Sequence, residues 1–133
     1  MMLSGGVAGV SQNEDSPTII ASTDVVQTTL SRNALRAIFG MRLRNWPSGE
    51  PVQVFVLSDN HPLHIRFCKQ MLNIFPHQLR FAWDRQVFSG TGQAPRIVDS
   101  VQEMHNKVAT TPGAIGYLVR SRIDESVRVL PIE

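Results

Sequence analysis

The sequence lacks the features of a disulfide-stapled, membrane-spanning or nucleic-acid-binding protein. Its 133 residues include a single cysteine, so no internal disulfide can form. No stretch approaches the roughly 18 apolar residues that cross a bilayer, and we therefore predict no membrane span. The formal net charge is only +2, and there is no long run of Lys or Arg, which argues against a nucleic-acid partner.

The sequence also lacks motifs for catalysis, cofactor binding and metal binding. It contains no Ser-His-Asp pattern, paired-carboxylate motif or nucleotide fingerprint, which predicts a non-enzymatic protein with no catalytic residues and no cofactor. His61 and His64 are three residues apart, but no third ligand stands at a suitable spacing, so we expect no metal. Cys68 lies among apolar neighbours, far from any obvious base, and is expected to be an inert core thiol.

The composition is that of an ordinary small globular protein. Hydrophobic residues make up 42% of the chain and charged residues 18%, and the length suits one domain. We predict that residues 17–133 form that single domain. Residues 1–16 are interpreted as a flexible leader or as the remnant of a signal peptide, because they are small and apolar but lack a basic start.

The hydrophobic pattern predicts strands that alternate with helices. Strands are expected at residues 18–22, 52–57, 114–119 and 127–130. Four helix starts are indicated by capping residues or proline, at Ser31, at one of Asp59, Asn60 and His61, at Pro76 and at Ser100. Such alternation favours an α/β fold with a mixed, mostly parallel sheet flanked by helices.

Helical spacing also predicts which side chains face the core. The first helix should end at Gly40 in a left-handed cap. Residues expected on the inner helix faces are Leu35, Ile38 and Phe39, then Ile65, Cys68, Met71 and Leu72, then Leu79, Trp83 and Val87, and finally Val101, Met104 and Val108. The larger aromatic residues are interpreted as core or hinge packing, namely Trp46, Phe81, Trp83 and Phe88.

Three stretches together resemble the phosphate-binding proteins of bacterial ABC transporters, in the type II periplasmic-binding-protein superfamily. Residues 30–40 followed by 44–46 are similar to that family's helix and tryptophan turn. Residues 54–59 are similar to the strand that leads into its anion loop. Residues 110–117 resemble its late helix-to-strand junction and are the most specific of the three. The resemblance implies a fold equivalent to one lobe of these two-lobed proteins.

The resemblance fails at the residues that hold the anion in that family. There, the strand ends in an arginine and continues as Ser-Asp-Gly-Ser-Gly-Thr. Here Leu57 takes the place of the arginine, and residues 60–63 (Asn-His-Pro-Leu) replace Gly-Ser-Gly-Thr. Pro62 has no amide hydrogen and Leu63 has no hydroxyl, so two groups that would donate to a phosphate are lost. We therefore expect weak or lost binding of a phosphate-like anion.

Two segments are candidates for residual anion binding, at low affinity. Ser58, Asp59 and Asn60 precede a helix whose N-terminal amides attract an anion, although helix capping alone also explains these residue types. Ser89, Gly90 and Thr91 belong to a loop with two glycines that could line an oxyanion or could be a plain connection. If a site exists, both segments are expected at the same end of the sheet.

Two functions remain open from the sequence. The first is an exported, solute-binding-like domain with weak or lost affinity for a small oxyanion such as phosphate. A lone lobe cannot close on its ligand, so tight binding would need a homodimer or a protein partner to supply the missing lobe. The second is a protein-interaction or scaffold module that keeps the lobe fold without its ligand. A polar concavity would favour the first, and an exposed apolar face would favour the second.

Overall fold

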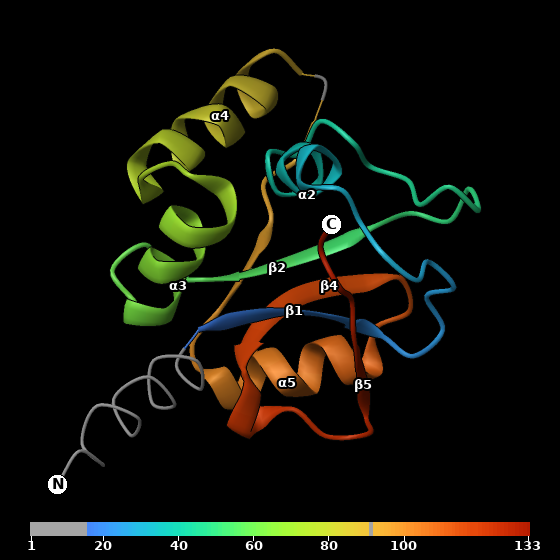
Figure 1. The fold of residues 1–133 in the computed structure, drawn as a ribbon. Coiled ribbons are helices and arrows are strands. Elements are labelled where there is room, and N and C mark those ends of the chain that lie inside the picture. Colours follow the sequence, from blue (N-terminus) through green and yellow to red (C-terminus); the bar gives the residue numbers. More distant parts are fainter. Residues whose placement is uncertain (1–15, 91) are drawn as a thin grey trace, which may run out of the picture.

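A computed structural model describes residues 16–90 and 92–133, whose centre is a five-stranded sheet (Figure 1). The predicted leader, apart from Ser16, and Thr91 lie outside the described residues. The strands are β1 (Pro17–Ser22), β2 (Gln53–Leu57), β3 (Arg96–Val98), β4 (Ala114–Val119) and β5 (Val127–Val129). Their order in the sheet is β3-β2-β4-β1-β5.

The sheet is mixed, which confirms the predicted fold class. Strand β2 runs parallel to both β3 and β4, whereas β1 is antiparallel to both β4 and β5. Among the described strands, parallel pairings therefore make up half of the sheet rather than most of it. Strand β3 has only three residues, too few to give the alternating pattern by which the sequence could reveal it.

Helices cover both faces of the sheet. They are α2 (Arg32–Phe39), α3 (Pro62–Phe67), the π-helical turn η1 (Cys68–Leu72), α4 (Pro76–Phe88), α5 (Val101–Thr110) and the 3-10 turn η2 (Arg120–Arg122). Two neighbouring residues of β4 show the layering, because successive side chains of a strand point to opposite faces. A Cβ at Gly116 would lie 2.6 Å from Met104 Sδ of α5, whereas Tyr117 stacks on Phe67 of α3 on the other face.

The helix starts follow the capping residues that the sequence indicates. The Ser31 hydroxyl accepts from the amide of Ala34, and the Ser100 hydroxyl accepts from the amide of Glu103. Of the three candidates before α3, His61 is the N-cap, and its Nδ1 accepts from the amide of Leu63. Proline opens both α3 and α4, where an amide hydrogen is not needed.

The junction that leads into β4 requires glycine. Gly113 has φ +77°, and a Cβ there would stand 2.5 Å from the carbonyl oxygen of Pro51. The carbonyl oxygen of Gly113 accepts from Trp46 Nε1 at 3.0 Å and from the amide of Gln53 at 3.0 Å. The tryptophan turn and the late junction, separate in the sequence, therefore meet at one hydrogen-bonded corner.

Several predictions about individual residues are wrong. Gly40 has φ −82°, and the left-handed residue is the next one, Met41, with φ 64°. Ile65 is exposed because the buried face of α3 is formed by Leu63, His64 and Phe67. Met71, in the π turn that shifts the helical register, is half-buried, and Val87 is exposed because α4 buries only Leu79 and Trp83. Phe81 and Phe88 are exposed, although Trp46 and Trp83 are buried as expected. Among the described residues, no helix is long and apolar enough to cross a membrane.

Candidate functional site

The N-terminus of α3, where the sequence places the first anion candidate, is occupied by its own side chains. The Ser58 hydroxyl donates to Asn60 Oδ1 at 2.9 Å, and His61 Nδ1 accepts from the amide of Leu63 at 3.1 Å. Pro62 contributes no donor. The side chain of Leu57, at the arginine position of the resembled family, is fully buried. The Ser58 hydroxyl and the Leu63 amide, two donors that could approach an anion here, are therefore already used within the chain.

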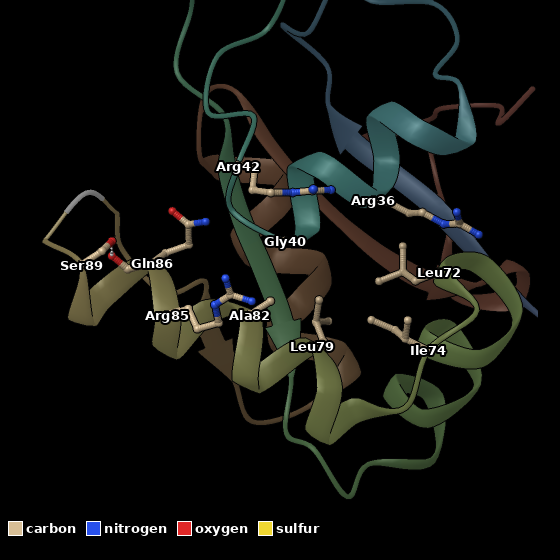
Figure 2. A pocket seen from close by; sticks show the side chains of 10 residues that line it. All are labelled: Arg36, Gly40, Arg42, Leu72, Ile74, Leu79, Ala82, Arg85, Gln86 and Ser89. Atoms are coloured by element: carbon tan, nitrogen blue, oxygen red, sulfur yellow. Dashed lines mark hydrogen bonds between the residues drawn. The ribbon is translucent and has the colours of Figure 1, made fainter.

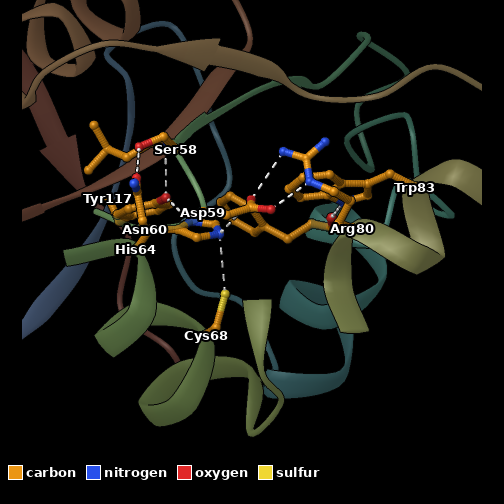
Figure 3. Close-up of polar contacts among 10 residues, drawn as sticks. Ser58, Asp59, Asn60, His64, Cys68, Arg80, Trp83 and Tyr117 are labelled. Atoms are coloured by element: carbon orange, nitrogen blue, oxygen red, sulfur yellow. Dashed lines mark hydrogen bonds and ion pairs between the residues drawn. The ribbon is translucent and has the colours of Figure 1, made fainter. Parts of the chain in front are cut away.

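Asp59 forms the strongest polar contact of this region. Its carboxylate accepts from Arg80 Nε at 2.6 Å and from Arg80 Nη2 at 3.1 Å, which is the two-pronged geometry that arginine makes with carboxylates (Figure 3). The hydrogen bond from Arg80 lowers the pKa of Asp59. Because both side chains remain partly exposed, this ion pair contributes only modestly to stability. It places a carboxylate at the mouth of the predicted anion site.

A buried polar group joins β2, α3 and β4 behind Asp59. The hydroxyl of Tyr117 accepts from the amide of Leu57 at 2.9 Å and contacts His64 Nδ1 at 2.5 Å. Since the phenol has one proton and His64 Nδ1 is its partner, we assign the O–H as donor and the imidazole proton to Nε2. Burial lowers the pKa of His64 to about 4, so the ring is neutral at pH 7.

Cys68 lies beside His64 but does not form a reactive pair with it. Its Sγ is 3.5 Å from His64 Nε2, and Asp59 Oδ1 lies 4.0 Å from the same nitrogen. The expectation that Cys68 is far from a base is therefore wrong. Burial raises the pKa of Cys68 to about 12, and the thiol is fully buried, so it stays protonated and out of reach of a substrate.

The second anion candidate lies at the other end of the sheet. Ser89 is the C-cap of α4, and Gly90 follows it with φ +76°. The chain then enters β3 at its N-terminal end, whereas Ser58 follows the C-terminal end of the parallel strand β2. The expectation that the two segments share one end is therefore wrong. A helix C-terminus also presents carbonyl groups rather than amides, so the backbone of this segment offers an anion no free helix N–H donors.

A groove between α2 and α4 carries charged side chains. It has a volume of about 590 Å³, and three arginines line it, together with Ser89 (Figure 2). Its charged lining residues are Arg36, Arg42 and Arg85. Sequence reasoning missed this groove because the three arginines are spread over residues 36–85 and only the packing of α4 on α2 brings them together. The hydrogen bond from Trp83 Nε1 to the carbonyl oxygen of Phe39 fixes that packing.

The described residues contain no group of three or more His, Cys, Asp or Glu side chains placed to hold a metal ion. His61 caps α3 and His64 is buried against Tyr117, so the two histidines do not act together. His105 Nε2 instead pairs with Asp124 at 2.9 Å on the surface, and this hydrogen bond raises the pKa of His105.

Comparison with solved structures relates this geometry to known proteins. An ABC-type phosphate transport receptor from Vibrio cholerae matches with a TM-score of 0.69 and 17% identity over 88% of this chain. PstS from Borrelia burgdorferi matches with a TM-score of 0.68 and 18% identity over 89%. The fold is that of one lobe of a phosphate-binding protein. No family model and no curated protein sequence matches the chain.

The matches also delimit what is similar. A phosphate ABC transporter substrate-binding protein from Clostridium perfringens, solved with bound phosphate, has a TM-score of 0.69 at 18% identity. The chain spans 44–47% of the length of these three structures. The resemblance seen in the sequence is thereby confirmed for the fold of one lobe. Identities below one fifth show the fold and not the ligand.

Proposed function

We propose that this chain is a non-enzymatic, solute-binding-like lobe whose affinity for phosphate at the N-terminus of α3 is weak or lost. The fold of the transport receptors supports the binding-protein part of the proposal. The same fold favours export to the outside of the cytoplasmic membrane, because transport receptors of this kind capture solutes there. The chain spans less than half of those structures, so any opposing wall would have to come from outside these residues.

The observation that carries the proposal is the self-capped start of α3. His61 takes the amide of Leu63, Pro62 has no amide hydrogen, and Asp59 brings a negative charge held by Arg80. A phosphate would have to displace the imidazole and approach this carboxylate without an arginine beneath it. Charge-assisted hydrogen bonds from arginine contribute about twice as much as neutral ones, so their absence weakens binding substantially.

Titration with inorganic phosphate at constant ionic strength, followed by the NMR amide signals of Asn60 and Leu63, tests this proposal. We expect no saturable shift in the millimolar range. The double variant His61→Ser/Pro62→Gly, which restores a hydroxyl and a free amide, should gain a response at the same signals. The matched surface variant His77→Ser should not. A saturable shift of the Leu63 amide in the unmodified chain would overturn the proposal.

A second candidate, a protein-interaction module, is favoured by the outer face of α4. Phe81 is 64% exposed and Phe88 is 87% exposed, although large aromatic side chains are usually covered. The opposite face of α4 holds Leu79 and Trp83 in the core, so these two phenylalanines are free for a partner surface. A second copy of the chain would bury them symmetrically.

Sedimentation velocity over a wide concentration range distinguishes this candidate. If two copies dock through α4, the sedimentation coefficient should rise with concentration, and Phe81→Asp/Phe88→Asp should abolish the rise. Phe75→Asp, an exposed residue before the same helix, serves as the control and should leave it unchanged. A monomer at every concentration would remove the self-docking candidate.

A further inference from the structure

The groove between α2 and α4 combines cationic and apolar walls, and its size suits a small molecule. Its volume of about 590 Å³ falls within the range of roughly 300 to 1,000 Å³ that ligand pockets occupy. Figure 2 shows Arg42 and Arg85 on the two sides of the gap, one beyond the end of α2 and the other on α4. The groove lies away from the α3 N-terminus and shares none of its residues.

The three arginines of the groove form no ion pair within the described residues. None of the residues that line it is Asp or Glu. In the described part of the chain, the ion pairs of acidic residues use Arg80 or histidine, and none involves Arg36, Arg42 or Arg85. The groove is thus lined by three permanently charged arginines and by no acidic residue.

Arg36 adds an unsatisfied donor within this arrangement. Its Nε is buried, and no group of the described protein accepts its hydrogen. A buried donor without an acceptor costs free energy, and native proteins rarely leave one unless a solvent molecule, an ion or a ligand completes it. The last turns of α2 and α4 explain Arg36 and Arg85 in part, because cations stabilise helix C-termini. Arg42 follows α2 in the chain, and its Nε lies 3.6 Å from where a Cβ of the C-cap Gly40 would stand, so the same explanation covers part of its role.

The remaining lining of the groove is apolar. Leu72 and Ile74 come from the turn after α3, and Leu79 and Ala82 come from the inner side of α4. Leu72 and Leu79 are already buried, whereas Ile74 and Ala82 are half-buried, so a ligand with a carbon body would cover the apolar surface that these two leave accessible. The lining therefore selects for a molecule with both an anionic head and an apolar part.

We propose that this groove binds a small organic anion, with its carboxylate or phosphate head on Arg42 and Arg85 and its apolar body on Ile74 and Ala82. Planar guanidinium forks match either kind of head group. Side-chain amides and hydroxyls at the rim, from Gln86 and Ser89, border the head-group end. This inference is independent of whether phosphate binds at α3.

Three probe molecules distinguish the contribution of the anionic head group to binding from that of the apolar body. Phenyl phosphate carries both, inorganic phosphate carries only the head, and phenol carries only the body. In NMR titrations of the full chain at constant ionic strength, phenyl phosphate should shift the signals of Ile74, Ala82 and Gln86 in a saturable way. Inorganic phosphate and phenol should each bind at least about tenfold more weakly, because each loses one of the two contributions.

Matched variants locate the site. Arg85→Gln and Arg42→Gln should each weaken phenyl phosphate binding by about tenfold or more, since each removes a charge-assisted hydrogen bond. Ala82→Glu should abolish it by placing a carboxylate inside the groove. Arg122→Gln, an exposed arginine of η2 outside the groove, is the charge-matched control and should bind as the unmodified chain does.

Other outcomes would overturn the proposal. If Arg122→Gln and Arg85→Gln weaken the binding of phenyl phosphate equally, the net charge of the protein and not the groove is responsible. If only the signals of Asn60 and Leu63 shift, the anion binds at the N-terminus of α3. That result would contradict both the groove proposal and the proposed loss of phosphate affinity at α3. If phenyl phosphate shifts no groove signal while all variants remain folded by circular dichroism, the arginines serve only the helix ends.

Discussion

The α3 N-terminus and the groove between α2 and α4 treat their polar groups in opposite ways. At α3, His61 caps an amide, Asp59 pairs with Arg80, and Tyr117 links Leu57 to His64. In the groove, three arginines face a hollow without an acidic partner. Groups that satisfy one another stabilise a fold, whereas groups left unsatisfied are available to a ligand. The region that matches the family's anion loop is thus the closed one.

The largest effect expected at the α3 region is on the pH dependence of stability, and it is caused by the buried side chain of His64. Its pKa in the folded state is about 4, against about 6.5 when unfolded. Below pH 6.5 the unfolded chain takes up a proton that the folded chain refuses, so stability should fall as the pH drops towards 4. The loss should reach roughly 3 kcal/mol, from about 1.4 kcal/mol for each pKa unit.

Urea unfolding at several pH values between 7 and 4, together with NMR titration of the histidine signals, measures this loss. His61, whose pKa burial also lowers, adds to it in the same direction. His105 acts oppositely, because its raised pKa gives stability that is lost as the pH rises, and His105→Gln removes that contribution. A His64 signal that titrates near 6.5 would show that this cluster is open to solvent.

Removal of the Tyr117 hydroxyl should have the next largest effect. Tyr117→Phe removes the hydrogen-bond partner of the Leu57 amide and of His64 Nδ1 inside the core. The expected loss is about 2 kcal/mol in the free energy of unfolding at pH 7, measured by chemical denaturation. Phe67→Leu, which changes the ring stacked on Tyr117 but no hydrogen bond, separates packing from polar satisfaction. An unchanged stability would contradict the polar role of Tyr117.

Breaking the ion pair at the surface of the same region should matter less. Asp59→Asn removes the charge that pairs with Arg80, and both side chains are partly exposed. We expect a loss of at most about 1 kcal/mol by thermal or urea unfolding. The loss should shrink at high salt, because screening weakens exposed ion pairs. A loss as large as that of Tyr117→Phe would mean that the pair is a buried structural element.

The smallest effect on stability is expected in the groove. Arg42→Gln removes a cation that pairs with no carboxylate of the described chain, so its free energy of unfolding should stay within about 0.5 kcal/mol of the original. We expect a slight gain in the free energy of unfolding, because the variant relieves repulsion among like charges. Chemical denaturation at low salt measures this change. A loss above 1 kcal/mol would assign Arg42 a structural role and would weaken the contrast between the two regions.

The sequence alone identified the features that depend on neighbouring residues. Capping at Ser31 and Ser100, the proline starts of α3 and α4, and the buried strand β2 are local patterns, and they appear where predicted. The resemblance at residues 110–117 was informative because Gly113 meets a steric requirement that no other residue satisfies. The replacement of the anion loop could also be recognised from the sequence, because proline has no amide hydrogen and leucine has no hydroxyl to donate.

Only the tertiary structure decided what those residues contact. The pairing of Asp59 with Arg80 and the burial of His64 depend on where α4 and β4 pack, which local spacing does not encode. The parallel course of β2 and β3 separated the two predicted anion segments to opposite ends. Likewise, Arg36, Arg42 and Arg85 form one groove only because Trp83 holds α4 against the end of α2. Sequence patterns indicate local conformation and helix ends, but the buried face of each helix and the proximity of distant side chains follow from how the elements pack.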